Sequence, residues 1–318
     1  MQTDADLIII GAGPAGLTAA QYGARSNLSV LVLEQLAPGG QALLIDALEN
    51  YPGIQPGKTG FEFSEDLHRQ AEEFGAKFLT EQAQALNKEG ELFTVTLGNG
   101  QKRSALAVII ATGAKHRTLD IPGEKEFSGR GVSYCATCDG PFFKNKKIFV
   151  AGGGDAACDE AQYLSKLTNQ VIMIHRRERF RAQKALAERV LRNPNITVRF
   201  NTVMKEIKGA AGGGKVASVV LGGTQPADCT PYEESADAVF IFTGMVPQTS
   251  LVSELKAQTD ETGYIVTDER MASSVPGLFA AGDVRATPFR QVVTAAGDGA
   301  TAAHCAAAYI DSLKGEAY

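Results

Sequence analysis

Two cysteines separated by two residues are the clearest chemical feature of the sequence. Cys135 and Cys138 lie in the stretch YCATCDGP at residues 134–141, and the chain of 318 residues has further cysteines at positions 158, 229 and 305. A single Cys-x-x-Cys pair suits half of a zinc site, a structural disulfide, or a redox couple that opens and closes.

Zinc and a structural disulfide are the weaker alternatives. A zinc site needs two further ligands at matching spacing, and the sequence has no second Cys-x-x-Cys and only four scattered histidines. No metal is therefore expected. Disulfide frameworks are unusual in reducing compartments, and the N-terminal MQTDADLIII lacks the basic start and cleavage site of a signal peptide. We favour a redox couple and expect the other cysteines to be small buried hydrophobes.

An element that can bring a nucleotide to this couple occupies residues 6–34, where an apolar run, a glycine motif, a helical stretch and a second apolar run follow one another. In the motif GAGPAG, Gly11 permits a tight turn, Gly13 lets backbone amides approach a pyrophosphate, and Gly16 lets the helix pack on the strand. Glu34 ends the second strand, where a carboxylate can accept hydrogen bonds from a ribose. The pattern predicts a dinucleotide site, the alternative being a plain glycine-rich turn.

The same pattern recurs from Lys146 to Arg177. Gly152 and Gly154 take the first two glycine positions and Ala157 takes the third. His175 stands as far from Gly152 as Glu34 stands from Gly11. A second nucleotide unit is therefore predicted, with a different residue at the end of its second strand.

That difference carries chemical information. Where the first unit ends in a carboxylate, the second ends in the tract HRRERFR, with His175, Arg176, Arg177 and Arg181. The carboxylate of Glu34 would repel a 2′-phosphate, whereas the basic side chains of the tract would form ion pairs with it. NADPH is expected over NADH, the alternative being a solvated basic face.

Composition limits the class of protein. Hydrophobic residues make up 44% and charged residues 21% of the chain, with a net charge of -5, as in soluble globular proteins. No apolar run reaches the length of a membrane span, so a cytoplasmic location without membrane association is expected. Nucleic-acid binding is not expected either, because the charges of both signs are interspersed.

Two nucleotide units suggest two domains. VIIATGA at 108–114 and GLFAAGDV at 277–284 read as buried strands that end in glycine turns, and a small-residue helix is expected from about Gln291. Such a helix can pack against a cofactor or only against protein. Crossing strands at 115–124 and 243–250 indicate that residues 117–246 form a domain inserted into a domain of residues 1–116 and 247–318.

With these residues in place, the chain resembles the low-molecular-weight thioredoxin reductases along nearly its whole length. The motifs occur in the family's order: GAGPAG, GGQ at 39–41, ENYPG at 49–53, ATGA at 111–114, CATCDG at 135–140, GGGDAA at 152–157, HRRERFRA at 175–182, and AGDV followed by RQ at 290–291. The resemblance implies an α/β fold of two Rossmann-like, three-layer ββα domains, an FAD domain and an inserted NADPH domain that carries the dithiol. It also implies a homodimer that reduces thioredoxin or a similar redoxin.

The resemblance assigns two sets of cofactor residues. The residues expected to bind FAD are Gly11, Gly13, Pro14, Ala15, Gly16, Glu34, Gln35, Gly39, Gly40, Gln41, Asn50, Ala111, Thr112, Gly113, Gly282, Asp283, Arg290, Gln291 and Val292. The residues expected to bind NADPH are Gly152, Gly154, Asp155, Ala156, Ala157, His175, Arg176, Arg177 and Arg181.

The resemblance also implies the roles of the redox residues. Cys138 accepts electrons from the flavin, Cys135 attacks the substrate disulfide, and Asp139 is the acid and base, unless it is only a turn residue. Nicotinamide and dithiol would then reach the flavin alternately as the inserted domain rotates.

The stretch after the GGQ motif and the residues around the dithiol carry further expectations. The stretch ALLIDAL after GGQ replaces a threonine-rich run that is frequent in the family, so flavin potential and oxygen reactivity are expected to differ. Arg130, Phe142 and Phe143 bracket the dithiol and suit docking of thioredoxin, although the two rings suit the core equally well. Dithiol oxidation or a ferredoxin donor are the alternative activities, and a zinc-stabilised interaction module is the non-enzymatic one.

Overall fold

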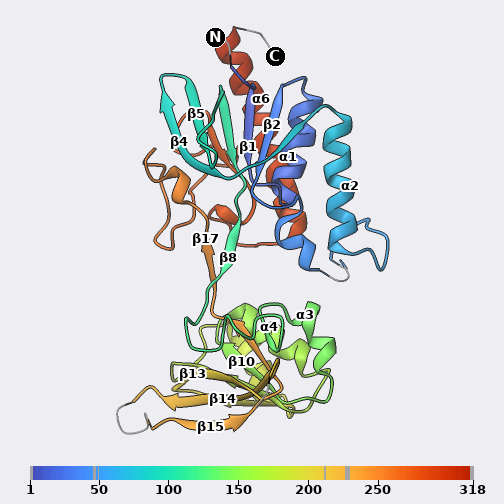
Figure 1. The fold of residues 1–318 in the computed structure, drawn as a ribbon, viewed down its shortest axis with the longest axis vertical. Helices are drawn as coiled ribbons and strands as arrows, with labels where there is room; N and C mark the ends of the chain where they lie inside the picture. The colour runs from blue at the N-terminus through green and yellow to red at the C-terminus, as the bar shows by residue number, and fades with distance from the viewer. Residues whose placement is uncertain (1–2, 46–47, 49, 211–212, 226–229, 316–318) are drawn as a thin grey trace. The chain divides into compact units, whose positions relative to one another are not determined.

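The chain forms two compact units. The computed structural model describes residues 3–45, 48, 50–210, 213–225 and 230–315. Unit 1 comprises Met1–Lys115 with Val246–Tyr318, and unit 2 comprises His116–Met245. The chain passes between them through strands β8 (Ala114–His116) and β17 (Met245–Pro247), which pair with each other (Figure 1). Unit 2 is thus an insertion in the sequence of unit 1.

Unit 1 is built on a parallel sheet with the strand order β18-β7-β1-β2-β3. Its strands are β1 (Leu7–Ile10), β2 (Val30–Glu34), β3 (Lys77–Thr80), β7 (Ala107–Ile110) and β18 (Leu278–Ala280). The central strands read LIII and AVII and are buried along their whole length. Continuous apolar runs of this kind form strands that are covered on both faces.

Two layers cover this sheet. Leu7 and Ile9 of β1 pack among the helices, whereas Ile8 and Ile10 pack under a small antiparallel sheet. The helices are α1 (Pro14–Arg25), α2 (Gly60–Glu73) and α6 (Val292–Lys314), and the antiparallel strands are β4 (Ala83–Glu89), β5 (Leu92–Leu97) and β6 (Lys102–Ala105). Alternate side chains of one strand therefore belong to two separate cores.

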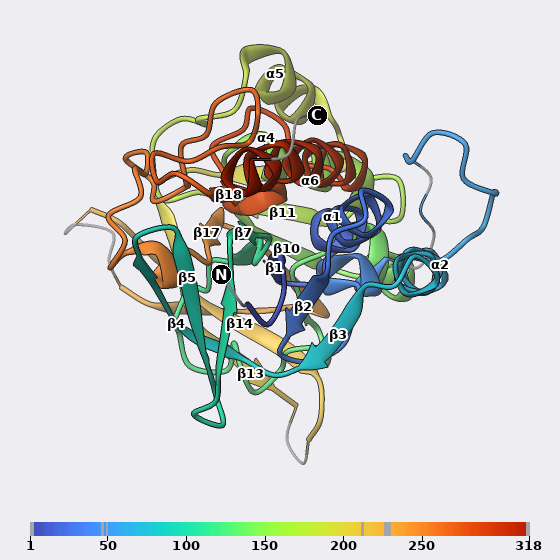
Figure 2. The same cartoon turned by 90° about the horizontal axis from the view of Figure 1, so that it is seen from above.

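The long C-terminal helix confirms the expectation of a helix from about Gln291. Gln291 is the N-cap of α6, and α6 lies beside α1 (Figure 2). The approach is close, because a Cβ atom at Gly299 would lie 2.1 Å from the carbonyl oxygen of Ala15. The small residues of this stretch thus serve packing of one helix on another.

Unit 2 repeats the three layers. Its parallel sheet has the order β12-β11-β10-β16-β9, with Ile148 and Val150 facing helices and Phe149 and Ala151 facing an antiparallel sheet. The elements are β9 (Val132–Ser133), α3 (Ala136–Asp139), β10 (Ile148–Gly152), α4 (Asp155–Leu164), β11 (Val171–Ile174), α5 (Lys184–Arg192), β12 (Ile196–Arg199), β13 (Thr202–Gly209), β14 (Val216–Gly223), β15 (Tyr232–Ser235) and β16 (Ala238–Phe242). The predicted α/β class with two three-layer nucleotide folds is confirmed.

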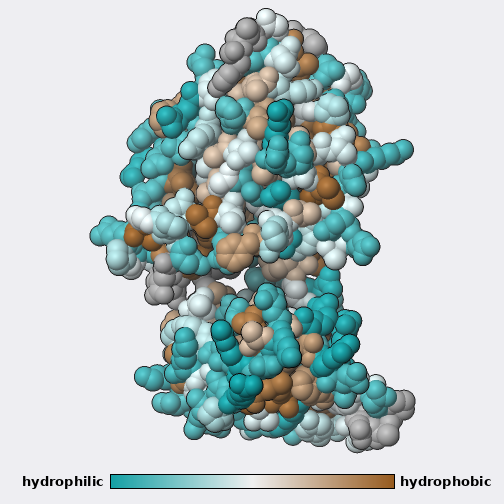
Figure 3. All heavy atoms as spheres, turned by 180° about the vertical axis from the view of Figure 1, so that it is seen from behind, coloured by the Kyte–Doolittle hydropathy of each residue, from teal (hydrophilic) through white to brown (hydrophobic). Residues whose placement is uncertain are grey.

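Short 3₁₀ turns complete the described chain: η1 (Gly40–Leu44), η2 (Gly140–Phe143), η4 (Ser250–Val252) and η5 (Gly282–Val284). The face drawn in Figure 3 is mostly hydrophilic in both units. Of the helices that the structure describes, none has the length and hydropathy to cross a bilayer. Within the same residues, no cluster of three or more His, Cys, Asp or Glu side chains could hold a metal ion.

Candidate functional site

The motif GAGPAG forms the turn between β1 and α1. Gly11 has a φ of 102°, and a Cβ atom there would lie 2.4 Å from the carbonyl oxygen of Ala111, so only glycine fits. A Cβ atom at Gly16 would lie 1.9 Å from the carbonyl oxygen of Gly11. At Gly13, by contrast, no described atom lies within 4 Å of the Cβ position. This side of the turn is open at the start of a helix of 12 residues, where an anion is favoured.

The carboxylate of Glu34 braces this turn. Its Oε2 accepts a hydrogen bond from the Ala12 N–H at 2.8 Å, and its Oε1 accepts one from the Leu36 N–H at 3.0 Å. A carboxylate has further lone pairs for hydroxyl donors, so the placement is compatible with the expected ribose contact. Gln35 is exposed beside it, and Pro14 and Ala15 open α1.

A second segment of the sequence-predicted site lies against the same turn. The Gly39 N–H donates to the Ala12 carbonyl at 2.7 Å, and the Cβ position of Gly40 lies 3.1 Å from Gly13 Cα. Gln41 Nε2 donates to the carbonyl of Ala114, which follows the predicted residues Ala111, Thr112 and Gly113. Residues 39–41 and 111–113 therefore come together at one edge of the sheet.

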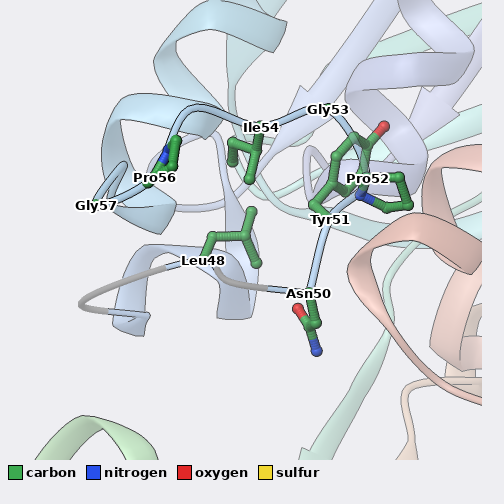
Figure 4. A pocket seen from close by; sticks show the side chains of 8 residues that line it. All are labelled: Leu48, Asn50, Tyr51, Pro52, Gly53, Ile54, Pro56 and Gly57. Carbon is green, nitrogen blue, oxygen red and sulfur yellow. The ribbon is translucent and has the colours of Figure 1, made fainter.

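The loop after η1 brings Asn50 to the start of α6. Asn50 Nδ2 donates to Gln291 Oε1 at 2.8 Å. A cavity of about 610 Å³ beside it is lined by Leu48, Asn50, Tyr51, Pro52, Gly53, Ile54, Pro56 and Gly57, and the side chains of Leu48 and Ile54 point toward each other (Figure 4). Asn50 thus borders this cavity and also contacts the N-cap residue of α6.

The turn after β18 carries a partly buried carboxyl group, that of Asp283. Burial raises its pKa, the charge of Arg290 opposes this rise, and the charge of Asp298 adds to it. Arg290 lies over the ring of Tyr264, 3.9 Å from its centroid. Its Nε atom is buried and has no hydrogen-bond partner in the described part of the chain. A buried donor without a partner is rare, so this guanidinium is available to a bound group.

Sequence reasoning missed the residues that hold this turn. Arg285 Nη1 pairs with Asp298 Oδ2 at 3.0 Å, and both side chains are largely buried. The same Oδ2 accepts the Gly282 N–H at 3.2 Å. Arg285 Nε also donates to Thr267 Oγ1 at 2.8 Å. The ion pair therefore links the turn of Asp283 to α6. No local sequence motif predicts this contact.

In unit 2 the second glycine turn borders a cavity of about 530 Å³. No atom of the described residues lies within 4 Å of the Cβ position of Gly154, which matches the open side at Gly13. Asp155 follows and accepts hydrogen bonds from the N–H and the Nε2 of Gln183, at 2.7 and 3.1 Å. The sequence-predicted residues that line this cavity are Gly152, Gly154, Asp155, Ala156, Ala157, His175, Arg176 and Arg181.

His175 is buried under the glycine turn and is only 8% exposed. A Cβ atom at Gly153 would lie 2.3 Å from its Nδ1. Burial lowers the pKa of the imidazole, and the positive charges of Arg181 and Arg177 lower it further. This placement gives His175 a supporting role beneath the turn. Arg176, Arg177 and Arg181 are exposed, and the Arg181 N–H donates to the Gly153 carbonyl at 2.7 Å.

The redox loop begins in the same unit. Cys135 is disulfide-bonded, whereas the side chain of Cys138 lies outside the described part of the structure. The Cys135 N–H donates to Ser133 Oγ at 3.1 Å, and the Asp139 N–H donates to the Cys135 carbonyl at 3.2 Å. Cys158 is a free, buried thiol whose pKa burial raises to about 11, as expected for a core residue. Cys305 is only partly buried, and Cys229 lies outside the described residues.

A further cavity of about 420 Å³ lies beside the loop, lined among others by Arg130, Asp139, Phe142 and Phe143. The two phenylalanines differ in their exposure. Phe142 is 76% exposed, whereas Phe143 packs edge-on against Phe240 with ring centroids 6.0 Å apart. Only Phe142 is thus available as an exposed anchor, and Phe143 belongs to the core.

The cavity at the second glycine turn also reaches the redox loop. His116, Tyr134 and Glu160 border it together with Gly152, and none of the three was singled out from the sequence. Tyr134 directly precedes Cys135, so its position in the chain was a signal. Its contact with the cavity depends on the fold and is not predictable from its position in the chain.

Comparisons with known proteins agree with this arrangement. The family described as "Pyridine nucleotide-disulphide oxidoreductase" matches residues 5–299. A thioredoxin reductase of Treponema pallidum is 56% identical over 314 residues, 99% of this chain and 100% of that protein. The crystal structure of Lactococcus lactis thioredoxin reductase in its FR conformation has a TM-score of 0.79 and 41% identity, covering 97% of this chain and 100% of that one. A thioredoxin reductase structure from Streptococcus pyogenes has a TM-score of 0.76 and 42% identity, covering 97% and 98%.

Proposed function

The chain belongs to the pyridine nucleotide-disulphide oxidoreductase family and groups with its thioredoxin reductases, and from this premise we propose that it reduces the disulfide of thioredoxin or a similar redoxin with electrons from NADPH, through FAD and the Cys135/Cys138 pair. One observation carries the proposal. The disulfide-bonded Cys135 follows Tyr134, which borders the same cavity as the second glycine turn. A thiol couple beside a nucleotide cavity suits a reductase.

FAD fits the residues of unit 1. The open side of Gly13 leaves room for a pyrophosphate, and the buried Arg290 Nε offers a donor that has no partner among the described residues. The residues that would hold FAD are those expected from the sequence in segments 11–16, 34–35, 39–41, 111–113, 282–283 and 290–292, with Asn50. When bound, FAD supplies the two-electron chemistry between nicotinamide and disulfide.

NADPH fits the cavity of unit 2. The open side of Gly154 leaves room for its pyrophosphate at the start of α4. Arg176 and Arg181 line the cavity and Arg177 is exposed next to Arg176, so three guanidinium groups are available for a 2′-phosphate. NADH lacks that phosphate and would bind more weakly.

For the thiol steps we adopt the roles that the family resemblance implies for the residues of the redox loop. The Cys135 thiolate attacks one sulfur of the substrate disulfide, forms a mixed disulfide, and displaces the other sulfur as a thiolate. We assign to Asp139 the proton that this leaving thiolate takes up. Cys138 then attacks Cys135, releases the second substrate thiol, and re-forms the internal disulfide. Two electrons and two protons have passed to the substrate.

The exposed ring of Phe142 and the guanidinium of Arg130 border one cavity beside this loop. We infer that they receive the protein substrate, the ring as an apolar anchor and the charge as a guide for an acidic partner. We also expect the chain to act as a homodimer, as the family resemblance implies.

A coupled assay tests the proposed function. Holoenzyme is mixed with NADPH, and NADPH absorbance is followed with and without an oxidised bacterial thioredoxin, while free thiols are counted. We expect one NADPH to be consumed for each two thiols formed, and only with the protein disulfide present. Equal consumption without thioredoxin would indicate an oxidase and would contradict the proposal.

A further inference from the structure

A buried carboxylate that the proposed chemistry does not use lies behind the redox loop. Glu124 is 1% exposed. Its Oε2 accepts the Asp120 N–H at 2.8 Å, and both oxygens accept the Leu119 N–H at 3.0 Å. Burying a charged group is costly unless hydrogen bonds compensate for its lost hydration. Glu124 therefore holds the chain where it enters unit 2.

The remaining partner of this carboxylate is the residue next to Cys135. Tyr134 Oη donates to Glu124 Oε1 at 2.7 Å. Burial raises the pKa of the phenol, and the bond to Glu124 raises it further, so the hydroxyl keeps its proton and remains a donor. The ring stacks on His116 with centroids 5.5 Å apart and planes inclined by 23°. Tyr134 is thus fixed at both its ring and its hydroxyl.

The residue on the other side of Cys135 is fixed as well. The Ala136 N–H donates to the carboxylate of Glu160 on α4, and Ala136 is fully buried. The Ser133 hydroxyl bonds to the backbone of Cys135 at 3.1 Å. The backbone of Cys135 is therefore held between two carboxylates, the buried Glu124 and the partly buried Glu160, and only Glu124 acts through a side-chain donor that can be removed alone.

We propose that Glu124 and Tyr134 are positioning residues that hold the redox loop in the geometry in which Cys135 forms its disulfide. The inference rests on the proposed redox role of this cysteine. Closing the disulfide removes two electrons and two protons from two thiols, and it is favoured when the thiols are held close together. A loop that loses its anchor explores more conformations, so its dithiol form gains entropy and the disulfide becomes easier to reduce.

Tyr134→Phe tests this directly, because it removes the hydroxyl and keeps the ring that stacks on His116. Anaerobic holoenzyme is equilibrated with mixtures of reduced and oxidised dithiothreitol, thiols are alkylated, and the oxidised fraction of Cys135 is measured by mass spectrometry. We expect the equilibrium constant for disulfide formation to fall roughly three- to tenfold, the net effect of one typical intramolecular hydrogen bond. Tyr232→Phe is the control, since Tyr232 is exposed and its hydroxyl is 3.5 Å from Arg199 Nη1.

A double-mutant cycle separates positioning from a general loss of packing. Glu124→Gln should shift the equilibrium in the same direction, and Tyr134→Phe should then add much less than it does in the wild-type background. Additive effects, or an equilibrium unchanged in Tyr134→Phe, would overturn the proposal. The measurement uses neither NADPH nor thioredoxin, so its failure would leave the proposed function untouched, and failure of the coupled assay would leave this result standing.

Discussion

Both units have a glycine turn between their first strand and first helix. They differ in the residues that lie at the end of the second strand and just after it. In unit 1 the carboxylate of Glu34 braces the glycine turn through the Ala12 N–H and retains lone pairs for a ligand. In unit 2 the bracing residue is His175, which is buried beneath Gly153, and the charged groups are the exposed arginines after it. Under the proposed function, one residue would combine support and recognition in unit 1, whereas unit 2 would divide these tasks between residues.

Under the proposed function, this difference would let one fold select two nucleotides. The strand, turn and helix would set the place of the pyrophosphate in both units, because Gly13 and Gly154 have the same open side. The residues at and just after the end of the second strand would then set the charge offered to the ribose. A nucleotide preference can therefore change without any change of architecture.

The largest effect is expected from replacing Cys135, because the Cys-x-x-Cys pair of unit 2 has no counterpart in the sequence of unit 1. Cys135→Ser should lower the rate of thioredoxin reduction roughly a thousandfold or more, as expected when a nucleophile is removed. Bleaching of the flavin by NADPH should persist, because unit 1 and the nucleotide cavity are unchanged. Stopped-flow absorbance and the coupled assay measure the two separately. Loss of both would show that the serine disrupts more than the thiol chemistry.

Removing one arginine tests the difference in recognition between the units. Arg181→Ala should raise the KM for NADPH roughly ten- to a hundredfold, the range for a lost charge-assisted hydrogen bond. The KM for NADH should stay within about twofold. Arg192→Ala is a matched control, because Arg192 is also exposed but lies at the end of α5. A parallel rise for both nucleotides would mean that Arg181 supports the turn.

The two phenylalanines contrast surface with core within unit 2. Phe142→Ala should raise the KM for thioredoxin roughly three- to tenfold and leave a small aromatic disulfide unaffected. Phe143→Ala should instead lower the free energy of unfolding by about 3 kcal/mol, because it opens a cavity beside Phe240. Steady-state kinetics and denaturant titration distinguish the outcomes. Equal kinetic losses for both substrates in Phe142→Ala would assign that ring to the fold.

The smallest effect concerns the residue that braces the turn of unit 2. Burial lowers the pKa of His175, and of His116, below the usual 6.5. The unfolded chain therefore takes up these protons first, so stability that is fully present above 6.5 is lost as the pH falls below that value. We expect His175→Gln to flatten this loss while shifting the KM for NADPH less than Arg181→Ala does. An unchanged pH slope in denaturant titrations would contradict a buried neutral imidazole.

Much of the architecture was readable from local pattern. The glycine motifs, the apolar runs and the small-residue stretch after Gln291 predicted the two parallel sheets and α6, because turn chemistry and burial act over a few residues. The link between Asn50 and Gln291 could not be derived in that way, nor could the pairing of Arg285 with Asp298. Such contacts arise only when distant segments meet in the fold.

The basic tract shows where pattern reasoning stops short. All four cationic side chains were assigned to a 2′-phosphate, yet the structure buries His175 and leaves the three arginines exposed. The sequence marks residue types along the chain, and the direction of each side chain depends on the turn above it. Phe142 is exposed and Phe143 is packed in the core for the same reason.

We expect the two turns to hold different nucleotides, with unit 2 selecting NADPH. A stopped-flow experiment tests this preference: anaerobic holoenzyme is mixed with NADPH, or with NADH, and the flavin absorbance is followed. Bleaching should be fast with NADPH and roughly ten- to a hundredfold slower with NADH at equal, subsaturating concentration. Equal rates, or a yellow protein that neither nucleotide bleaches, would contradict the selection of NADPH by unit 2.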